Sequence, residues 1–139
     1  MLGTKTVAAM LAVRDLGTAR EFYENKLGLT LVDEGPEALV FKSGEAFAVV
    51  YRSEYAGTNK ATAAAWSAAD DFDTVLDGLR SKGVTFEHYD DLPDTTRDGD
   101  VHTAGDFKAA WFKDPDGNIL SIVNQAMQRT ATTSSATAG

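Results

Sequence analysis

Few residues in this sequence could carry out acid–base or metal chemistry. The two histidines are His88 and His102, and the chain contains no cysteine. The candidates for an acid–base pair are Glu87, His88, Tyr51 and Asp100. Nothing in their spacing specifies a reaction. A histidine and nearby carboxylates can hold zinc, but such sites need three protein ligands on a rigid frame. We therefore expect no metal site at these residues.

The composition limits the classes of partner. The chain has 139 residues, is 43% hydrophobic and carries a formal net charge of −8. Its acidity argues against nucleic acid and anionic membrane surfaces as partners. No apolar run reaches the roughly 18 residues that a membrane span needs, and residues 1–10 lack the features of a signal peptide. We predict a cytoplasmic protein with one globular domain.

The elements that must position these residues occur twice. In the first half, an apolar run at 7–13 predicts a buried strand, and Asp15 or Thr18 can cap the helix that follows. Gly28 stands where a helix-ending glycine belongs. Three further strands are predicted at 29–33, 38–42 and 46–52.

The second half repeats this order. It begins with an apolar run at 62–68, and Asp70-Asp71 caps a helix that ends at Gly83. A strand at 84–89 and a polar loop at 90–105 follow. The sequence Asp114-Pro115-Asp116-Gly117-Asn118 predicts the turn of a closing hairpin formed by 107–113 and 118–124. The two copies lie about 55 residues apart.

The repeat predicts an α+β fold of two βαβββ modules, because each copy alone would leave one sheet face bare. We expect one two-module domain over residues 1–125, with module one at about 5–53 and module two at about 61–125. The polar C-terminal tail, 126–139, has the composition of a disordered segment.

Four short motifs occur at characteristic places in the two copies: Val13-Arg14-Asp15-Leu16, Phe22-Tyr23, Leu27-Gly28-Leu29 and Asp114-Pro115-Asp116-Gly117-Asn118. In this order and spacing they resemble the vicinal oxygen chelate superfamily, which is the glyoxalase, bleomycin-resistance and extradiol-dioxygenase group. The resemblance covers about residues 5–125. The resemblance implies a curled, cup-shaped mixed sheet with the helices packed outside, ligands held inside the cup, and a homodimer.

Enzymes of this superfamily hold a divalent metal in the cup through His, Glu or Gln. Carried over by position, three of these ligands fall on Ala8, Ala64 and Ser121. The fourth lies in the strand at 46–52, which contains no His, Glu or Gln. Methyl groups and a lone hydroxyl cannot hold such a cation. We therefore predict that the protein is metal-free and has no cofactor.

Strand alternation then indicates which side chains share the cup. If Ala8, Ala64 and Ser121 point inward, so do Met10, Thr62 and Trp66. Aromatic residues add flat walls of the kind that small-molecule sites use. The predicted ligand-binding residues are Met10, Phe47, Tyr51, Thr62, Trp66, His102, Trp111, Phe112 and Ser121. Five aspartates in the loop 90–105, opposed only by Arg97, make that loop a candidate lid, although a solvated acidic loop is the simpler interpretation.

Metal-free members of the superfamily include proteins that sequester antibiotics. We therefore expect a small-molecule binding protein that holds a flat aromatic or glycopeptide-like antibiotic without catalysis. One alternative is an enzyme of the glyoxalase/dioxygenase type with a non-standard or metal-independent site. Another is a housekeeping or regulatory dimer that binds an unrelated metabolite.

Overall fold

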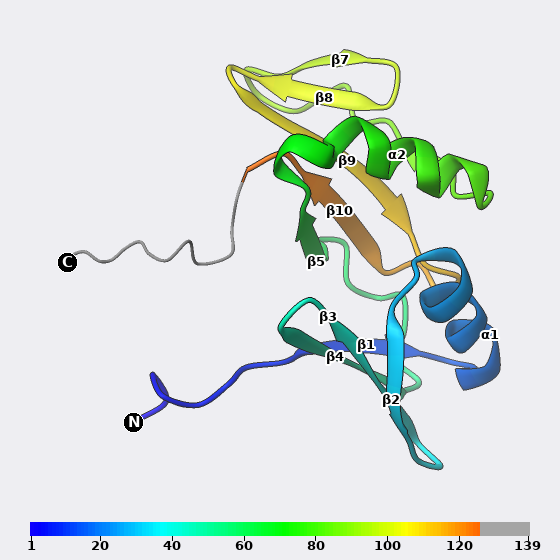
Figure 1. Ribbon diagram of the computed structural model, residues 1–139. Helices are drawn as coiled ribbons and strands as arrows, with labels where there is room; N and C mark the ends of the chain where they lie inside the picture. Colours follow the sequence, from blue (N-terminus) through cyan, green and yellow to red (C-terminus); the bar gives the residue numbers. More distant parts are fainter. Residues whose placement is uncertain (126–139) are drawn as a thin grey trace.

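The computed structural model describes residues 1–125 and contains two mixed sheets, each with its own helix (Figure 1). The predicted tail at 126–139 lies outside the described residues. In the first module the order along the chain is β1 (Ala9–Val13), α1 (Leu16–Arg20), a π-helical segment η1 (Glu21–Lys26), β2 (Thr30–Glu34), β3 (Ala38–Ser43) and β4 (Ala46–Arg52). The strands are ordered β1-β4-β3-β2, with β1 parallel to β4.

The second module repeats this plan with one added hairpin. Its elements are β5 (Thr62–Ser67), a 3-10 turn η2 (Ala69–Asp71), α2 (Phe72–Ser81), β6 (Phe86–Glu87), β7 (Thr96–Asp98), β8 (Val101–Ala104), β9 (Phe107–Lys113) and β10 (Ile119–Val123). The strands are ordered β5-β10-β9-β8-β7, β6 also pairs with β9, and β5 is parallel to β10. The predicted α+β class with curled βαβββ modules is confirmed.

Local features of the chain set the boundaries of the two predicted helices. Of the two candidate caps, Asp15 caps the first helix, because its carboxylate accepts a hydrogen bond from the Thr18 amide at 2.9 Å. Gly28 and Gly83 both follow their helices with positive φ, +76° and +86°. Only glycine adopts this conformation without a steric cost.

The prediction for residues 84–105 is wrong in two respects. The strand expected at 84–89 is reduced to Phe86–Glu87, and the expected polar loop contains β7 and β8. Two of the five aspartates in this segment form ion pairs, and the first of these joins Arg97 to Asp90 at 2.7 Å. Asp100 binds both Arg80 and His88. Opposite charges therefore hold this segment against α2 and β6.

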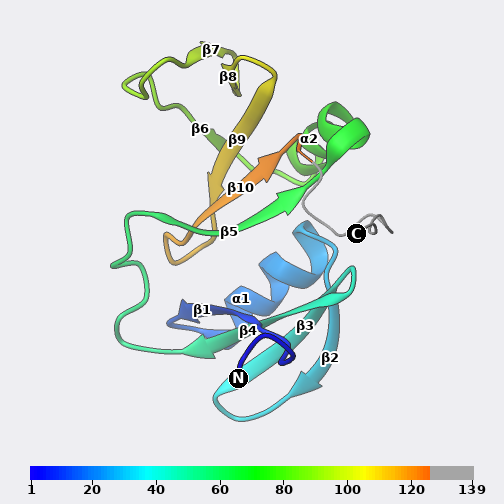
Figure 2. The same ribbon diagram turned by 90° about the vertical axis from the view of Figure 1, so that its left-hand side faces the viewer.

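One hydrophobic core joins the two modules. It contains Leu11, Phe41 and Val50 from the first sheet, Phe112 and Leu120 from the second, and apolar residues of both helices. The rings of Phe22 in η1 and Phe112 in β9 lie 6.4 Å apart. Figure 2 shows α1 against the first sheet, on the side that faces the second sheet. The helix-bearing faces of both sheets thus share this core, and we call the opposite side of each sheet its open face.

A buried polar cluster also links the modules. Tyr23 donates a hydrogen bond to the Asp114 carboxylate at 2.8 Å. The Asn118 amide donates to Asp114 at 2.7 Å and to the Ala12 carbonyl at 2.8 Å. Burial and the neighbouring Asp114 carboxylate both raise the pKa of Tyr23, so its hydroxyl stays a donor. The turn between β9 and β10 is thereby tied to the first module.

Candidate small-molecule site

The open face of the first module is apolar. Leu11 and Val13 in β1 are buried in the core, so Met10 lies on the opposite side, where it is 58% exposed. Met10 stands beside Val49 of β4, and Tyr51 follows two residues later on the same face. The structure therefore places two predicted ligand-binding residues, Met10 and Tyr51, on this face.

Several of the predicted ligand-binding residues with polar groups lie on the open face of the second module. Trp111 pairs with Ser121 across β9 and β10, and its indole N–H donates to the Thr62 hydroxyl at 3.1 Å. His102, in β8, lies beside this group with its ring 4.8 Å from that of Trp111. Thr62, His102, Trp111 and Ser121 therefore share this face, as the alternation predicts for Thr62 and Ser121.

His102 is a buried, neutral acceptor rather than an exposed acid or base. It is 1% exposed, and its Nε2 accepts a hydrogen bond from the Tyr89 amide at 2.9 Å. Burial lowers the pKa of His102, and the backbone of Ala109 acts in the opposite direction. Because a protonated Nε2 could not accept this bond, the contact requires the neutral ring.

The prediction that Ala64 and Trp66 point into the cup together with Ser121 is wrong. The pairing of β10 with β5 shifts register between Ile119 and Leu120, so that Trp66 lies opposite Ile122, a core residue. A shift of one residue moves the following side chains to the other face of a strand. Trp66 consequently stacks on Phe112 on the helix-bearing side, with ring centroids 6.5 Å apart.

The residues present do not fit the divalent metal that the resemblance implies. The residue at the second-module position, Ala64, faces the core, and Ala65 occupies the place beside Ser121. In β4 the open face offers Phe47, Val49 and Tyr51. Within residues 1–125, no group of three or more His, Cys, Asp or Glu side chains is placed to hold a metal ion.

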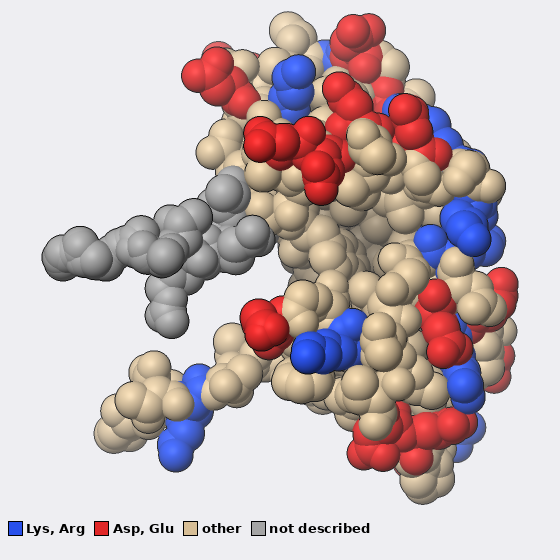
Figure 3. All heavy atoms as spheres, in the orientation of Figure 1, with Lys and Arg blue, Asp and Glu red and all other residues tan. Residues whose placement is uncertain are grey.

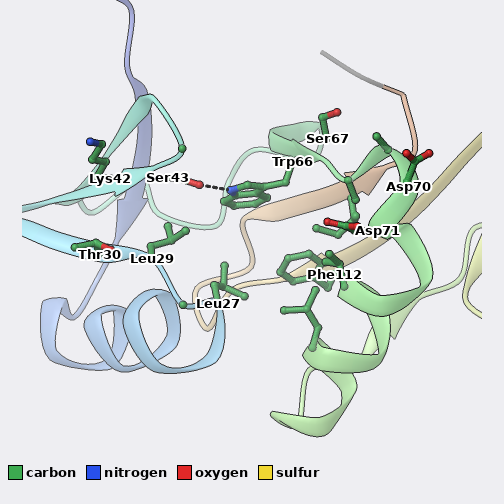
Figure 4. A pocket seen from close by; sticks show the side chains of 17 residues that line it. Leu27, Leu29, Thr30, Lys42, Ser43, Trp66, Ser67, Asp70, Asp71 and Phe112 are labelled. Atoms are coloured by element: carbon green, nitrogen blue, oxygen red, sulfur yellow. Dashed lines mark hydrogen bonds between the residues drawn. The ribbon is translucent and has the colours of Figure 1, made fainter. Parts of the chain in front are cut away.

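A first cavity of about 560 Å³ lies between the modules, next to Trp66 (Figure 4). Its floor is apolar and includes Leu27, Leu79, Phe112 and Ile122. Phe112 is fully buried, so it contributes a wall and is also a core residue. This volume is in the range of sites for small organic ligands.

The rim of the first cavity is polar and charged. Thr30 and Lys42 line it from the first module, and Asp70 and Asp71 line it from the start of α2. Figure 3 shows a hollow between the two halves of the molecule, with acidic side chains along its upper rim. Lys42, Asp70 and Asp71 form no ion pair with any other described residue. These charges are available to a ligand.

A second cavity of about 570 Å³ lies on the other side of Trp66. Small side chains dominate its lining, which includes Ala9, Ala46, Ala48, Ala64 and Ala65. Phe47, which is 39% exposed, also contributes to it. Trp66 thus borders both cavities, and the predicted ligand-binding residues fall into separate groups instead of one site.

Sequence reasoning missed the first-module part of the cavity rim. Lys42 ends the strand predicted at 38–42 and Ser43 follows it directly, and Asp70-Asp71 was interpreted as a helix cap. No local pattern shows that Ser43 meets Trp66, since they are 23 residues apart and belong to different modules. The acid–base candidates line neither cavity.

The fold and cavities define a class: a protein of paired βαβββ modules with an apolar, aromatic-walled space between them. Residues 5–122 match the profile of the Glyoxalase/Bleomycin resistance protein/Dioxygenase superfamily. The chain belongs to this superfamily. A search of curated proteins found no match.

Solved structures share the fold at low sequence identity. One is a glyoxalase/bleomycin resistance protein/dioxygenase from Alicyclobacillus acidocaldarius, with a TM-score of 0.66, 19% identity, and coverage of 86% of this chain and 90% of that chain. The fosfomycin resistance protein FosX from Mesorhizobium loti has a TM-score of 0.64, 15% identity, and coverage of 91% and 96%. Lactoylglutathione lyase from Agrobacterium tumefaciens has a TM-score of 0.63, 18% identity, and coverage of 86% and 92%.

No helix among residues 1–125 is long and apolar enough to cross a membrane.

Proposed function

We propose that this protein binds a flat aromatic molecule in the first cavity, against Trp66, and holds it without chemical change. Sequestration of an antibiotic is the role that such binding would serve. The observation that carries the proposal is an indole that borders a cavity of about 560 Å³ with an apolar floor and a charged rim. Stacking on such a ring adds about 0.5–1.5 kcal/mol beyond the burial of apolar area.

The residues around the cavity support binding over catalysis. Its polar lining consists of hydroxyls, Lys42, and the exposed carboxylates of Asp70 and Asp71. The Ser43 hydroxyl binds the Trp66 indole N–H, and Lys42, Asp70 and Asp71 form no ion pair with other described residues, so these four residues form no nucleophile–base or acid–base pair of the kind that catalysis uses. The predicted metal-ligand positions carry Ala8 and Ser121, which supports a metal-free function.

The family relationship is consistent with this role and does not specify it. Its name covers enzymes and resistance proteins, and the similar structures include both a fosfomycin resistance protein and a lyase. At identities below 25%, these likenesses describe the fold. The ligand must therefore be found by experiment.

A homodimer is part of the proposal. The first module presents an apolar open face that includes Met10, at 58% exposure, and Phe47, at 39%. Exposed apolar patches on a sheet are typical of protein interfaces. A second copy of this chain would bury these side chains.

Binding and the absence of turnover can be tested together. Purified, metal-stripped protein is dialysed against flat aromatic and glycopeptide antibiotics. The retained ligand is then recovered, and its molecular mass is measured by mass spectrometry. We expect retention of an aromatic ligand at one per chain with its mass unchanged. A ligand recovered with an altered mass would support the enzymatic alternative, and retention that requires added Zn²⁺, Ni²⁺, Mn²⁺ or Fe²⁺ would contradict the metal-free proposal.

A further inference from the structure

A wall of few residues separates the two cavities. Ser43, Gly44, Trp66 and Ser67 line both cavities. The indole Nε1–H of Trp66 donates a hydrogen bond to the Ser43 hydroxyl at 3.0 Å, and this contact links the two modules across the wall (Figure 4). Gly44 contributes no side chain, and a Cβ added there would meet no atom within 4 Å.

This wall is easy to open. A single neutral hydrogen bond has a small net stability in water, so its loss can be offset by new contacts with a ligand. Ser43 ends β3 beside a glycine turn, and rotation about its χ1 angle alone moves the hydroxyl away. Trp66 is only partly buried, so its ring is not locked in a closed core.

The two cavities differ in chemistry. The first has an aromatic and aliphatic floor with Lys42, Asp70 and Asp71 at its rim. The second is lined by five alanine methyl groups from β1, β4 and β5 together with Leu11 and Phe47, and Glu45 contributes the charged side chain of its lining. Each has a volume suited to one fused-ring system.

We propose that the two cavities form one two-compartment site, which takes an elongated ligand made of two flat ring systems joined by a short linker. The ligand displaces the Trp66–Ser43 hydrogen bond and passes Trp66, so that one ring system occupies each cavity. This inference rests on the proposed function and adds the size and shape of the ligand. Binding both ring systems in one chain raises affinity, because the second contact is intramolecular.

The test compares one ring system with two. Isothermal titration calorimetry with the full chain uses acridine orange as the single-ring-system probe and a bis-acridine with a short alkyl linker as the double one. We expect the bis-acridine to bind one per chain, at least about tenfold more tightly than acridine orange. Ser43→Ala removes the hydrogen bond across the wall, and we expect it to raise the ratio of bis-acridine affinity to acridine orange affinity by about two- to tenfold.

A cavity-filling variant identifies the second compartment. Ala46→Leu narrows only the second cavity, and Ala61→Leu, at an exposed position that lines neither cavity, is its matched control. We expect Ala46→Leu to remove the advantage of the bis-acridine while acridine orange binds as before, and Ala61→Leu to change neither. Thermal melting of both variants checks that they are folded.

The outcomes separate this inference from the proposed function. If acridine orange binds and the affinity of the bis-acridine is higher by no more than about twofold, the statistical factor for two ring systems, the two-compartment site is wrong and the proposed function stands. One bis-acridine per two chains, or a gain that survives Ala46→Leu, also overturns it. If neither probe binds, both the proposed function and this inference fail.

Discussion

Trp66 is the residue on which ligand binding depends most in this account. It borders both cavities and makes a ring contact with Phe112. We expect Trp66→Ala to weaken binding of a flat aromatic ligand by about 1–3 kcal/mol, through loss of stacking area. Titration calorimetry measures the change.

The other tryptophan is a matched control for Trp66. Trp111 lies on the open face of the second module and lines neither cavity. Trp111→Ala should leave the affinity for the same aromatic ligand close to that of the wild type. Urea denaturation of both variants reports their stability. Unchanged affinity in Trp66→Ala, together with a large loss of stability, would show that Trp66 is only a core residue.

His102 makes stability depend on pH. Burial lowers the pKa of His102 in the folded protein, so the unfolded chain binds a proton more readily. The contribution of the neutral ring is therefore fully present above the ordinary histidine pKa of about 6.5 and is lost as pH falls through the folded pKa. We expect the melting temperature to fall on acidification below that value.

The variant His102→Gln tests this assignment. Glutamine keeps an acceptor for the Tyr89 amide but does not titrate, so the melting temperature of this variant should vary less with pH than that of the wild type. Asp100, whose pKa is lowered by its hydrogen bond to His88 and by Arg80, contributes a separate loss at lower pH in both proteins. An equal pH dependence between pH ~5 and ~7 would show that His102 is not responsible.

At the scale of elements, the turn between β9 and β10 is fixed to the linker that joins the modules. Gly57 has φ of +78°, and a Cβ at this position would overlap the carbonyl oxygen of Asp116. We expect Gly57→Ala to destabilise the fold by about 2–5 kcal/mol, since it combines a left-handed backbone with a steric clash. Chemical denaturation gives the free energy of unfolding.

A second glycine separates the two causes. Gly105 has φ of +61° and open space around its Cβ position. Gly105→Ala should therefore cost only about 1 kcal/mol, from the backbone conformation alone. Equal losses in the two variants would mean that the turn moves away from residue 57 at no cost.

The buried Asp114 connects the same turn to the first module. Its carboxylate accepts hydrogen bonds from the side chains of Tyr23 and Asn118 and from the backbone amides of Asp116 and Asn118. We expect Tyr23→Phe to cost about 1.5–3 kcal/mol, because one hydrogen bond to a charged group is lost. Asp114→Ala should cost more, since it leaves several buried donors without a partner. The reverse order in urea denaturation would contradict this role of Asp114.

Much of this element plan could be predicted from sequence, because it follows from local signals. Helix caps, helix-ending glycines and turn residues all act on neighbouring residues, and the 55-residue repeat shows that the same local signals occur twice. The facing of Trp66 could not be predicted, because it depends on the register shift between β5 and β10, which are more than 50 residues apart. The β7–β8 hairpin was missed because its strands are short, and pairing with β9 and contacts to Arg80 stabilise it.

At the scale of the whole molecule, the candidate site was predicted in part. Trp66 and Phe112 do border a cavity, and Phe47 borders another. Lys42 and Ser43 were not predicted as lining residues, because only the packing of one module on the other brings them to Trp66. Met10, Tyr51, Thr62, His102, Trp111 and Ser121 lie on the open faces and line neither cavity, so the proposed function places the ligand away from them, and their predicted role in binding is untested.

The exposed open face of the first module predicts self-association. Met10→Asp places a charge in the centre of the proposed dimer interface, so we expect it to shift the protein to the monomer. Sedimentation velocity measures the oligomeric state. Val32→Asp, at an exposed position in β2, is the control and should stay dimeric. A wild-type protein that sediments as a monomer would contradict the dimer.

Fluorescence tests the central claim, binding against Trp66, most directly. The chain has two tryptophans, so the Trp111→Phe variant reports Trp66 alone, and Trp66→Phe reports Trp111 alone. We expect acridine orange to quench the emission of Trp66 with saturation at one ligand per chain, and to leave that of Trp111 nearly unchanged. Saturable quenching of Trp111 with none of Trp66 would place the ligand on the open face and contradict the account.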